Sequence, residues 1–209
     1  CDADFGNLLF GSFTPRLSSY TNPFQEPYVG VHVRHGDLAT EGQIFPLETL
    51  MGALKRAHPG MRSVFISTDD SDALAPERLA PFRAEGYKFR WTQEEQRFAG
   101  GTPGNIPHVT FPGNHPCDYK AVAAVMDDIS GLARATVLVG NFNSQFFKLA
   151  WFLSLHWHAA ESRPRPWCLD LYLGRSCDDQ RGQVEALCKS LAGKCDMGEI
   201  MAECSRAAR

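Results

Sequence analysis

The stretch YVGVHVRHGDLATE, residues 28–41, joins an apolar run to a cluster of charged and titratable side chains. Its first half alternates valine with glycine and histidine, a pattern that predicts a buried β-strand at residues 28–33. Four such side chains follow within eight residues: Arg34, His35, Asp37 and Glu41. Ligands of a parallel sheet bind beyond the carboxyl ends of its strands, so this cluster is a candidate ligand site.

Strand and helix patterns alternate through the rest of residues 28–162. The predicted strands cover residues 28–33, 62–68, 87–91 and 136–139, and the predicted helices cover 46–58, 72–85, 119–134 and 144–156. This order predicts an α/β domain, a Rossmann-like parallel sheet with helices on both faces. Residues 98–118 hold four glycines and four prolines and are predicted to form a long irregular loop.

Two flanking segments depart from this pattern. Residues 1–27 form a loop-rich lead-in, and residues 163–209 form a cysteine-rich tail with one or two helices, the clearest at 180–191. Five of the seven cysteines lie in this tail and none belongs to a CxxC pair, so disulfides are favoured over a zinc ribbon. Disulfides would indicate an oxidising compartment, whereas reduced, buried cysteines in a cytosolic protein are the alternative. Because seven is odd, at least one thiol is free or pairs outside the chain.

The composition is that of a globular protein, with 44% hydrophobic and 22% charged residues. A net charge of −3 provides no global basic field, so no nucleic-acid partner is expected. The sequence contains no Walker A loop, no GxGxxG fingerprint and no GxSxG elbow, which argues against ordinary P-loop, NAD-dependent and serine-hydrolase sites. No apolar run reaches the length of a membrane span.

Polar side chains also follow the other predicted strands. Asp69 and Asp70 come after the strand at 62–68, and Ser144 opens a helix after the strand at 136–139. A helix N-terminus can hold a phosphate, and the guanidinium of Arg34 can hold a diphosphate. Each feature also has a plain structural explanation: Arg34 as an ion-pair arginine, and the others as helix caps or turns. A magnesium site built on aspartates is conceivable, but no spacing demands one.

Taken together and in order, three segments carry a family resemblance. VGVHVRHGD (29–37), VFISTDD (64–70) and AVMDDISGLARATVLVGNFNSQFFKLAW (124–151) resemble the motifs of the fucosyltransferases that use GDP-fucose, closest to the α1,6 type. The resemblance covers about residues 25–157. It implies the C-terminal nucleotide-binding lobe of a two-lobed GT-B glycosyltransferase. Such an enzyme transfers fucose from GDP-fucose, with inversion, to a hydroxyl of a glycan or glycoprotein, and requires no metal or other cofactor.

The resemblance also implies roles for individual residues of the site. Glu41 matches the carboxylate proposed as the base that activates the acceptor hydroxyl, and it belongs with Arg34 and Asp37 to the catalytic group. Arg34 also holds the β-phosphate of the leaving group. The remaining binding residues are those for guanine (His32, Asp128, with Val125 against the base), those for the ribose and fucose side (Thr68, Asp69, Asp70) and those for phosphate (Ser144, Gln145).

The chain departs from the family pattern in three respects. His35 replaces the second basic residue of the α1,6 motif, and Leu38 stands where a lysine usually follows the aspartate. Only about 27 residues precede the first motif, so the acceptor-side lobe is expected from another segment or a second chain. These departures leave an alternative open, in which the chain is a catalytically degenerate lobe that serves as a structural or assembly subunit of a larger complex. A transferase for another GDP-sugar is a third possibility. The expected location is the Golgi lumen of the secretory pathway, or another organellar or extracellular complex for a structural subunit.

Overall fold

The computed structural model describes residues 24, 27–35, 43–92, 119–172 and 174–177. Its centre is a six-stranded sheet with the strand order β3-β2-β1-β4-β5-β6. The strands are β1 (Val29–Val33), β2 (Ser63–Thr68), β3 (Lys88–Arg90), β4 (Val137–Gly140), β5 (Trp167–Asp170) and β6 (Arg175–Ser176). The first five run parallel, and β6 pairs antiparallel with β5. The predicted Rossmann-like parallel sheet is confirmed.

Strand β1 is central because it pairs with β2 on one side and with β4 on the other. The chain moves outward from β1 through β2 to β3, and then crosses back to β4. The strand order therefore reverses between β1 and β4. In open α/β sheets, the crevice beyond the carboxyl ends of the strands at such a switch point is the usual ligand site.

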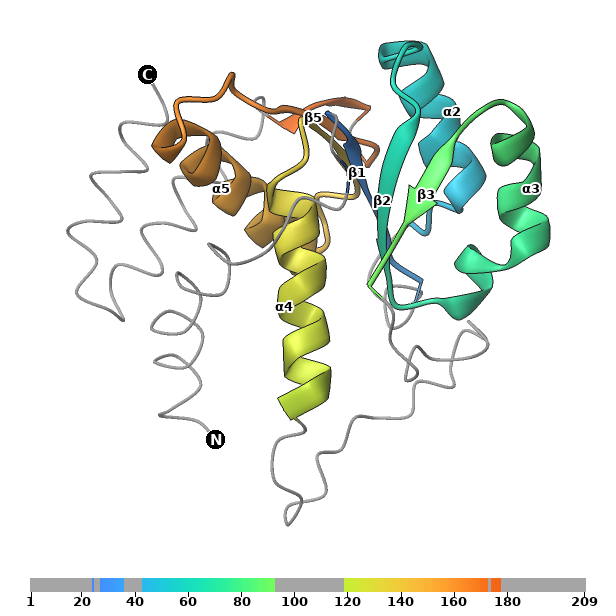
Figure 1. Cartoon of the computed structure of the whole chain (residues 1–209), viewed down its shortest axis with the longest axis horizontal. Coiled ribbons are helices and arrows are strands. Elements are labelled where there is room, and N and C mark those ends of the chain that lie inside the picture. The colour runs from blue at the N-terminus through green and yellow to red at the C-terminus, as the bar shows by residue number, and fades with distance from the viewer. Residues whose placement is uncertain (1–23, 25–26, 36–42, 93–118, 173, 178–209) are drawn as a thin grey trace.

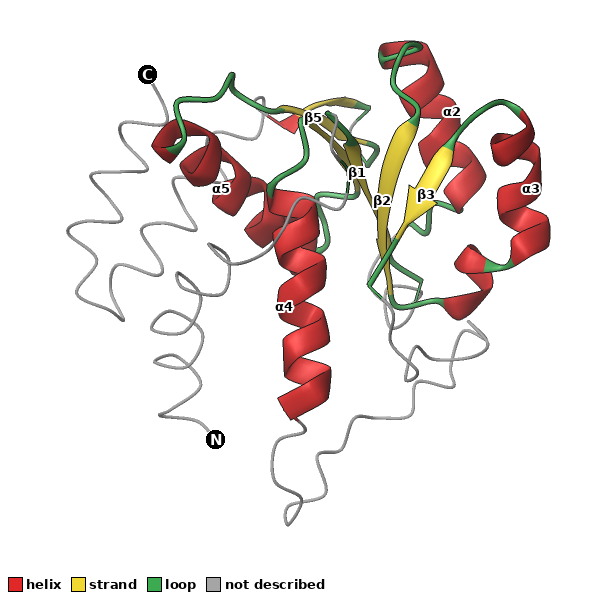
Figure 2. Cartoon of the chain, viewed as in Figure 1, coloured by secondary structure: helices red, strands yellow, loops and turns green. Residues whose placement is uncertain are grey.

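Helices cover both faces of the sheet, as Figures 1 and 2 show. The helices are α2 (Leu47–Ala57), α3 (Pro76–Ala84), α4 (Tyr119–Ala133) and α5 (Gln145–Ala160). On one face the valines of β1 pack with the apolar side of α2 and with Leu79 of α3. On the other face Phe65 and Leu138 pack with Leu132 of α4 and Trp151 of α5. Both faces of β1 are buried, which explains its near-continuous apolar sequence.

Glycines let α4 lie close to the sheet. A Cβ atom on Gly30 of β1 would lie 3.0 Å from the Leu132 side chain, and one on Gly131 of α4 would lie 2.4 Å from the Phe65 ring. The hydroxyl of Tyr28 also donates a hydrogen bond of 2.7 Å to the carbonyl of Gly131. Helix α4 is therefore fixed against β1 and β2 by direct backbone approach.

The described elements differ from the sequence predictions at three places. The helix predicted at 72–85 is a short 3-10 turn, η2 (Ser71–Leu74), followed by α3, because Pro76 lacks an N–H and starts a new helix. Helix α5 extends to Ala160, beyond the predicted end. Strands β5 and β6 are not among the predicted elements, and they extend the sheet past residue 162 into the cysteine-rich segment. The loop predicted at 98–118 and the helix predicted at 180–191 lie outside the described residues.

No helix in the described part of the chain is long and apolar enough to cross a bilayer.

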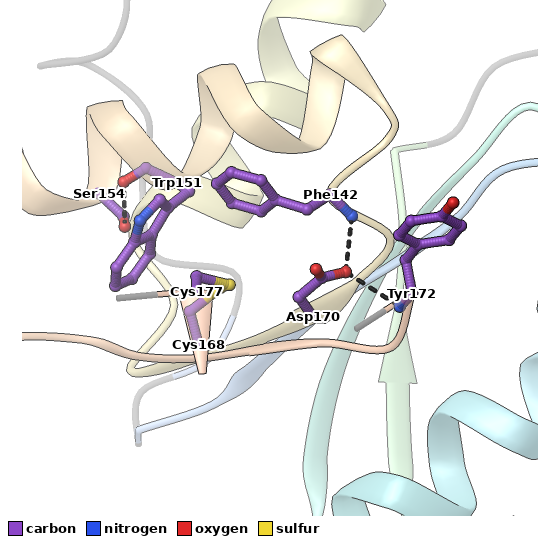
Figure 3. The surroundings of a disulfide bond; sticks show 7 residues. All are labelled: Phe142, Trp151, Ser154, Cys168, Asp170, Tyr172 and Cys177. Atoms are coloured by element: carbon purple, nitrogen blue, oxygen red, sulfur yellow. Dashed lines mark hydrogen bonds between the residues drawn. A yellow bond between two sulfur atoms is a disulfide. The ribbon is translucent and has the colours of Figure 1, made fainter. Parts of the chain in front are cut away.

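One disulfide joins β5 to the residue after β6, between Cys168 and Cys177, and confirms disulfide formation in the cysteine-rich segment (Figure 3). Both cysteines are buried, in the cluster that contains Trp151. The other five cysteines lie outside the described residues.

Replacing both cysteines of this bridge with alanine is expected to lower the free energy of unfolding by about 2.5 kcal/mol, mainly through the freedom regained by the unfolded chain. The sequence separation that sets this value is nine residues. Urea unfolding of the wild type and of the double variant measures the difference. Equal stability would show that the bridge does not restrain the β5–β6 hairpin.

Candidate functional site

The first part of the site lies at the switch point between β1 and β4. A hydrogen bond of 3.1 Å joins Nε2 of His32, in β1, to Oγ of Ser144, which follows β4. His32 is only 5% exposed. Its ring stacks on those of Phe146 and Phe147, with centroid distances of 5.1 and 6.0 Å. The contact brings together two residues that the sequence resemblance assigns to different parts of a nucleotide.

The turn between β4 and α5 places Ser144. Its Oγ accepts a hydrogen bond of 3.3 Å from the N–H of Phe147 and so caps α5. Upstream, the side chain of Asn141 accepts a hydrogen bond from the N–H of Asn143, and its carbonyl accepts one from the N–H of Ser144. Gly140 admits the Phe147 ring, because a Cβ there would lie 2.6 Å from it. The helix N-terminus is thereby held against His32.

Burial lowers the pKa of His32 to about 4; the nearby Arg34 adds to this effect and the Asp69 carboxylate opposes it. The imidazole is therefore neutral at physiological pH. Its Nδ1 atom is buried and makes no hydrogen bond of ordinary geometry in the described part of the chain. The backbone of Ser67 lies near enough to His32 to raise the pKa of the imidazole, but this effect is smaller than that of burial. A buried polar atom without a full hydrogen-bond partner lowers the stability of the fold, and a bound ligand is one means of supplying that partner.

The stability of the fold is expected to fall as the pH drops below about 6.5, because the unfolded state then binds a proton that folded His32 does not. The contribution is fully present above the unfolded pKa and is lost as the pH falls toward the folded value of about 4. At pH 5 the loss from His32 is about 2 kcal/mol relative to pH 7.5. Urea unfolding at both pH values measures it.

The control for this prediction is the His32→Gln variant, which cannot titrate. Burial also lowers the pKa values of His58 and His158, so the wild type has other sources of acid sensitivity. The difference between wild type and variant isolates His32. Identical pH dependence in the two proteins would mean that His32 is not held neutral by burial.

A second contact ties α4 to the same edge of the sheet. Ser67 of β2, the parallel neighbour of His32, donates a hydrogen bond of 3.1 Å to Oδ2 of Asp128. Val125, one turn earlier on α4, is 48% exposed. Residues three apart lie on the same side of a helix, so an exposed apolar side chain accompanies the carboxylate. This arrangement suits a flat heterocycle with hydrogen-bonding edges.

The third part of the site is a pair of contacts beyond the ends of β1 and β2, here called the double clamp: Arg34 with Asp69, and His35 with Asp70. Nη1 of Arg34 donates to Oδ2 of Asp69 at 2.8 Å, and the backbone N–H of His35 donates to Oδ1 of Asp69 at 2.9 Å. Nδ1 of His35 is hydrogen-bonded to Oδ2 of Asp70. The double clamp thus joins Arg34 and His35, which follow β1, to Asp69 and Asp70, which follow β2.

Asp70 also has a structural role at the start of η2. Its Oδ1 accepts a hydrogen bond of 2.9 Å from the N–H of Asp72, and its own N–H donates to Oγ1 of Thr68 at 3.0 Å. The helix-cap explanation of Asp70 and the ion-pair explanation of Arg34 both hold. Both explanations are compatible with a ligand at the carboxyl edge of the sheet, where all these groups lie.

The structure thus brings most of the predicted site residues to one edge of the sheet. Gln145 is exposed at the start of α5, beside Ser144. Asp37 and Glu41, predicted as catalytic, lie outside the described residues. Within the described ranges, no group of three histidine, cysteine, aspartate or glutamate side chains is placed to hold a metal ion.

Sequence reasoning missed residues that brace the site. Asp170, fully buried at the end of β5, accepts hydrogen bonds from the N–H groups of Phe142 and Tyr172 at 2.9 and 3.0 Å (Figure 3). Nδ2 of Asn141 donates to the carbonyl of Gln43 at 3.0 Å, which ties the start of the α2 segment to the same turn. Only a prediction of β5 could have identified Asp170.

No protein-family model matches the chain, and no curated protein matches it in sequence. The functional interpretation therefore rests on the motifs and on the geometry of the site.

Proposed function

We propose that the chain binds a GDP-sugar at the carboxyl edge of its sheet and acts as an inverting, fucosyltransferase-like glycosyltransferase. The sugar passes from GDP-fucose to a hydroxyl of a glycan or glycoprotein. The chain then corresponds to the nucleotide-binding lobe of a GT-B enzyme, and a second lobe supplies much of the acceptor surface. The disulfide supports a location in the secretory pathway, where the Golgi lumen is the expected compartment.

The observation that carries this proposal is the neutral, buried imidazole of His32 at the switch point. A cation there would favour an anion, whereas a neutral ring with an incompletely paired nitrogen favours an uncharged hydrogen-bonding partner such as a nucleobase. Asp128 accepts a hydrogen bond from Ser67, the residue that lies beside His32 on the neighbouring strand. A carboxylate suits the N–H groups of guanine. The exposed side chain of Val125 offers the face of the base an apolar contact.

The charges of the site suit a diphosphate leaving group. Arg34 lies beyond the end of β1, and the first N–H groups of α5 have no partner within the helix. A guanidinium and a helix N-terminus stabilise the negative charge that develops as the glycosidic bond to phosphate breaks. The acceptor oxygen attacks the anomeric carbon while Glu41 takes its proton, and GDP leaves with the bonding electrons.

Release of GDP from GDP-fucose tests the transferase proposal. Incubation of the chain with GDP-fucose, with water or glycoprotein glycans as acceptor, is expected to release GDP above the buffer rate. The Arg34→Ala variant is expected to lose this release. GDP-mannose serves as the control for the sugar. A chain that does not bind GDP at all would reject the proposed function.

A second candidate function is a glycosyltransferase-like structural or assembly subunit. It is favoured by the double clamp, in which Arg34 is already paired with Asp69 and Asp70 already serves His35 and η2. Such a subunit would associate stably with other chains and release no GDP. Sustained turnover of GDP-fucose by the purified chain would reject it.

A further inference from the structure

The imidazole of His35 has one satisfied and one unsatisfied nitrogen. Nδ1 is hydrogen-bonded to Asp70, whereas Nε2 is buried and has no hydrogen-bond partner in the described part of the chain. The side chain is 15% exposed and lies beyond the carboxyl end of β1, directly after Arg34. The second nitrogen is therefore a spare polar group within the candidate site.

Asp70 determines which nitrogen carries the hydrogen. A carboxylate only accepts hydrogen bonds, so Nδ1 of His35 must donate. In the neutral ring, Nε2 then presents a lone pair. A phosphate oxygen is also an acceptor and would meet that lone pair unfavourably. A phosphate can approach Nε2 only when this nitrogen carries a proton as well.

The charge of the double clamp leads to the same conclusion. The clamp contains one guanidinium, that of Arg34, and the two carboxylates of Asp69 and Asp70, so its net charge is −1 while His35 is neutral. A diphosphate adds further negative charge at the same edge. Protonation of His35 brings the clamp to neutrality and adds an N–H donor.

We propose that His35 is a proton-dependent phosphate ligand, and that binding of a nucleoside diphosphate takes up a proton from solvent onto its Nε2. This inference rests on the proposed function, because it concerns the diphosphate of the same nucleotide. The N–H bond formed at Nε2 donates to a phosphate oxygen, while the Nδ1–H bond to Asp70 is kept. No other covalent bond changes.

The charged groups that face His35 from the described elements are few. Asp70 contacts the ring and Asp69 contacts the backbone amide, both from the segment after β2. Arg34 precedes it in its own strand and is held by Asp69. His32, which burial keeps neutral, does not contribute protons near neutral pH.

Calorimetric titration with GDP in two buffers of different ionisation enthalpy measures the protons taken up on binding. The His35→Gln variant keeps the backbone contact to Asp69 but cannot titrate, and His35→Arg carries a permanent charge. Near pH 7.5, uptake per GDP is expected to be larger in the wild type than in either variant by about 0.5–1 proton. Because GDP is common to all three proteins, its own ionisation cancels in the comparison.

Because GDP binding is proposed to take up a proton, the affinity for GDP should fall as the pH rises. Between pH 6 and pH 8 the dissociation constant for GDP is expected to rise about tenfold more in the wild type than in His35→Arg. Guanosine, which has no phosphate, should bind with no such difference. Equal proton uptake in wild type and both variants would overturn this inference and leave GDP binding intact. Absence of GDP binding would instead reject the proposed function, and this inference with it.

Discussion

Gly131→Ala is expected to destabilise the chain by about 3 kcal/mol, although alanine is the better helix former. A Cβ at this position would lie 2.4 Å from two carbons of the Phe65 ring. Phe65 is 1% exposed in β2, within the core between the sheet and the helices α4 and α5. Because protein cores are close-packed, the buried ring cannot move aside without displacing its neighbours, so helix or sheet must shift. Urea unfolding measures the effect.

Gly52→Ala is the matched control. Gly52 lies in the interior of α2, and a Cβ there meets only the end of the Arg56 side chain, at 3.6 Å. This substitution should therefore stabilise the chain by roughly 0.5–1 kcal/mol through helix propensity alone. If Gly131→Ala stabilised the chain to the same extent, α4 would not pack on β2 as closely as described here.

Arg34→Ala is expected to weaken GDP binding by about a hundredfold. The substitution removes the cation at the end of β1, so the carboxylate of Asp69, which is only 16% exposed, faces the diphosphate without the guanidinium that balances its charge. Both effects disfavour the anion. Guanosine should lose little affinity, because its proposed contacts are with His32 and Asp128. Calorimetric titration with the two ligands separates the phosphate contribution from that of the base.

Arg83→Ala is the control for the loss of one positive charge. Arg83 is exposed in the last turn of α3, away from the residues of the candidate site. Its removal should change GDP affinity less than twofold at physiological salt, since exposed charges are screened. Comparable losses in both variants would indicate that only the net charge matters and that Arg34 is not a phosphate ligand.

Much of the fold could be predicted because its central strands are buried on both faces. The apolar runs of β1, β2 and β4 stand out from the helical patterns between them, and their alternation identifies a parallel sheet. Strand β5 could not be predicted, since WCLD spans four residues after a proline-rich segment. Its stability comes from pairing with β4, which is distant in sequence, and from the disulfide, whose partners no local pattern identifies.

The position of the site could be predicted from the residues that follow each strand, but its pairings could not. His32 and Ser144 are 112 residues apart, and only the return of β4 to the side of β1 brings them together. The spare Nε2 of His35 depends on the placement of Asp70 by η2, and no local pattern reveals it. Likewise, the stacking of His32 on Phe146 requires the first turn of α5 to lie beside β1.

The proposed function requires a guanine nucleotide to bind at the switch point between β1 and β4. Calorimetric titration of the chain with GDP and with ADP tests it most directly, with the His32→Phe variant as a comparison that keeps the aromatic packing. We expect one GDP per chain, ADP binding at least about tenfold weaker, and loss of this preference in the variant. Absence of GDP binding, or equal affinity for GDP and ADP in the wild type, would contradict it.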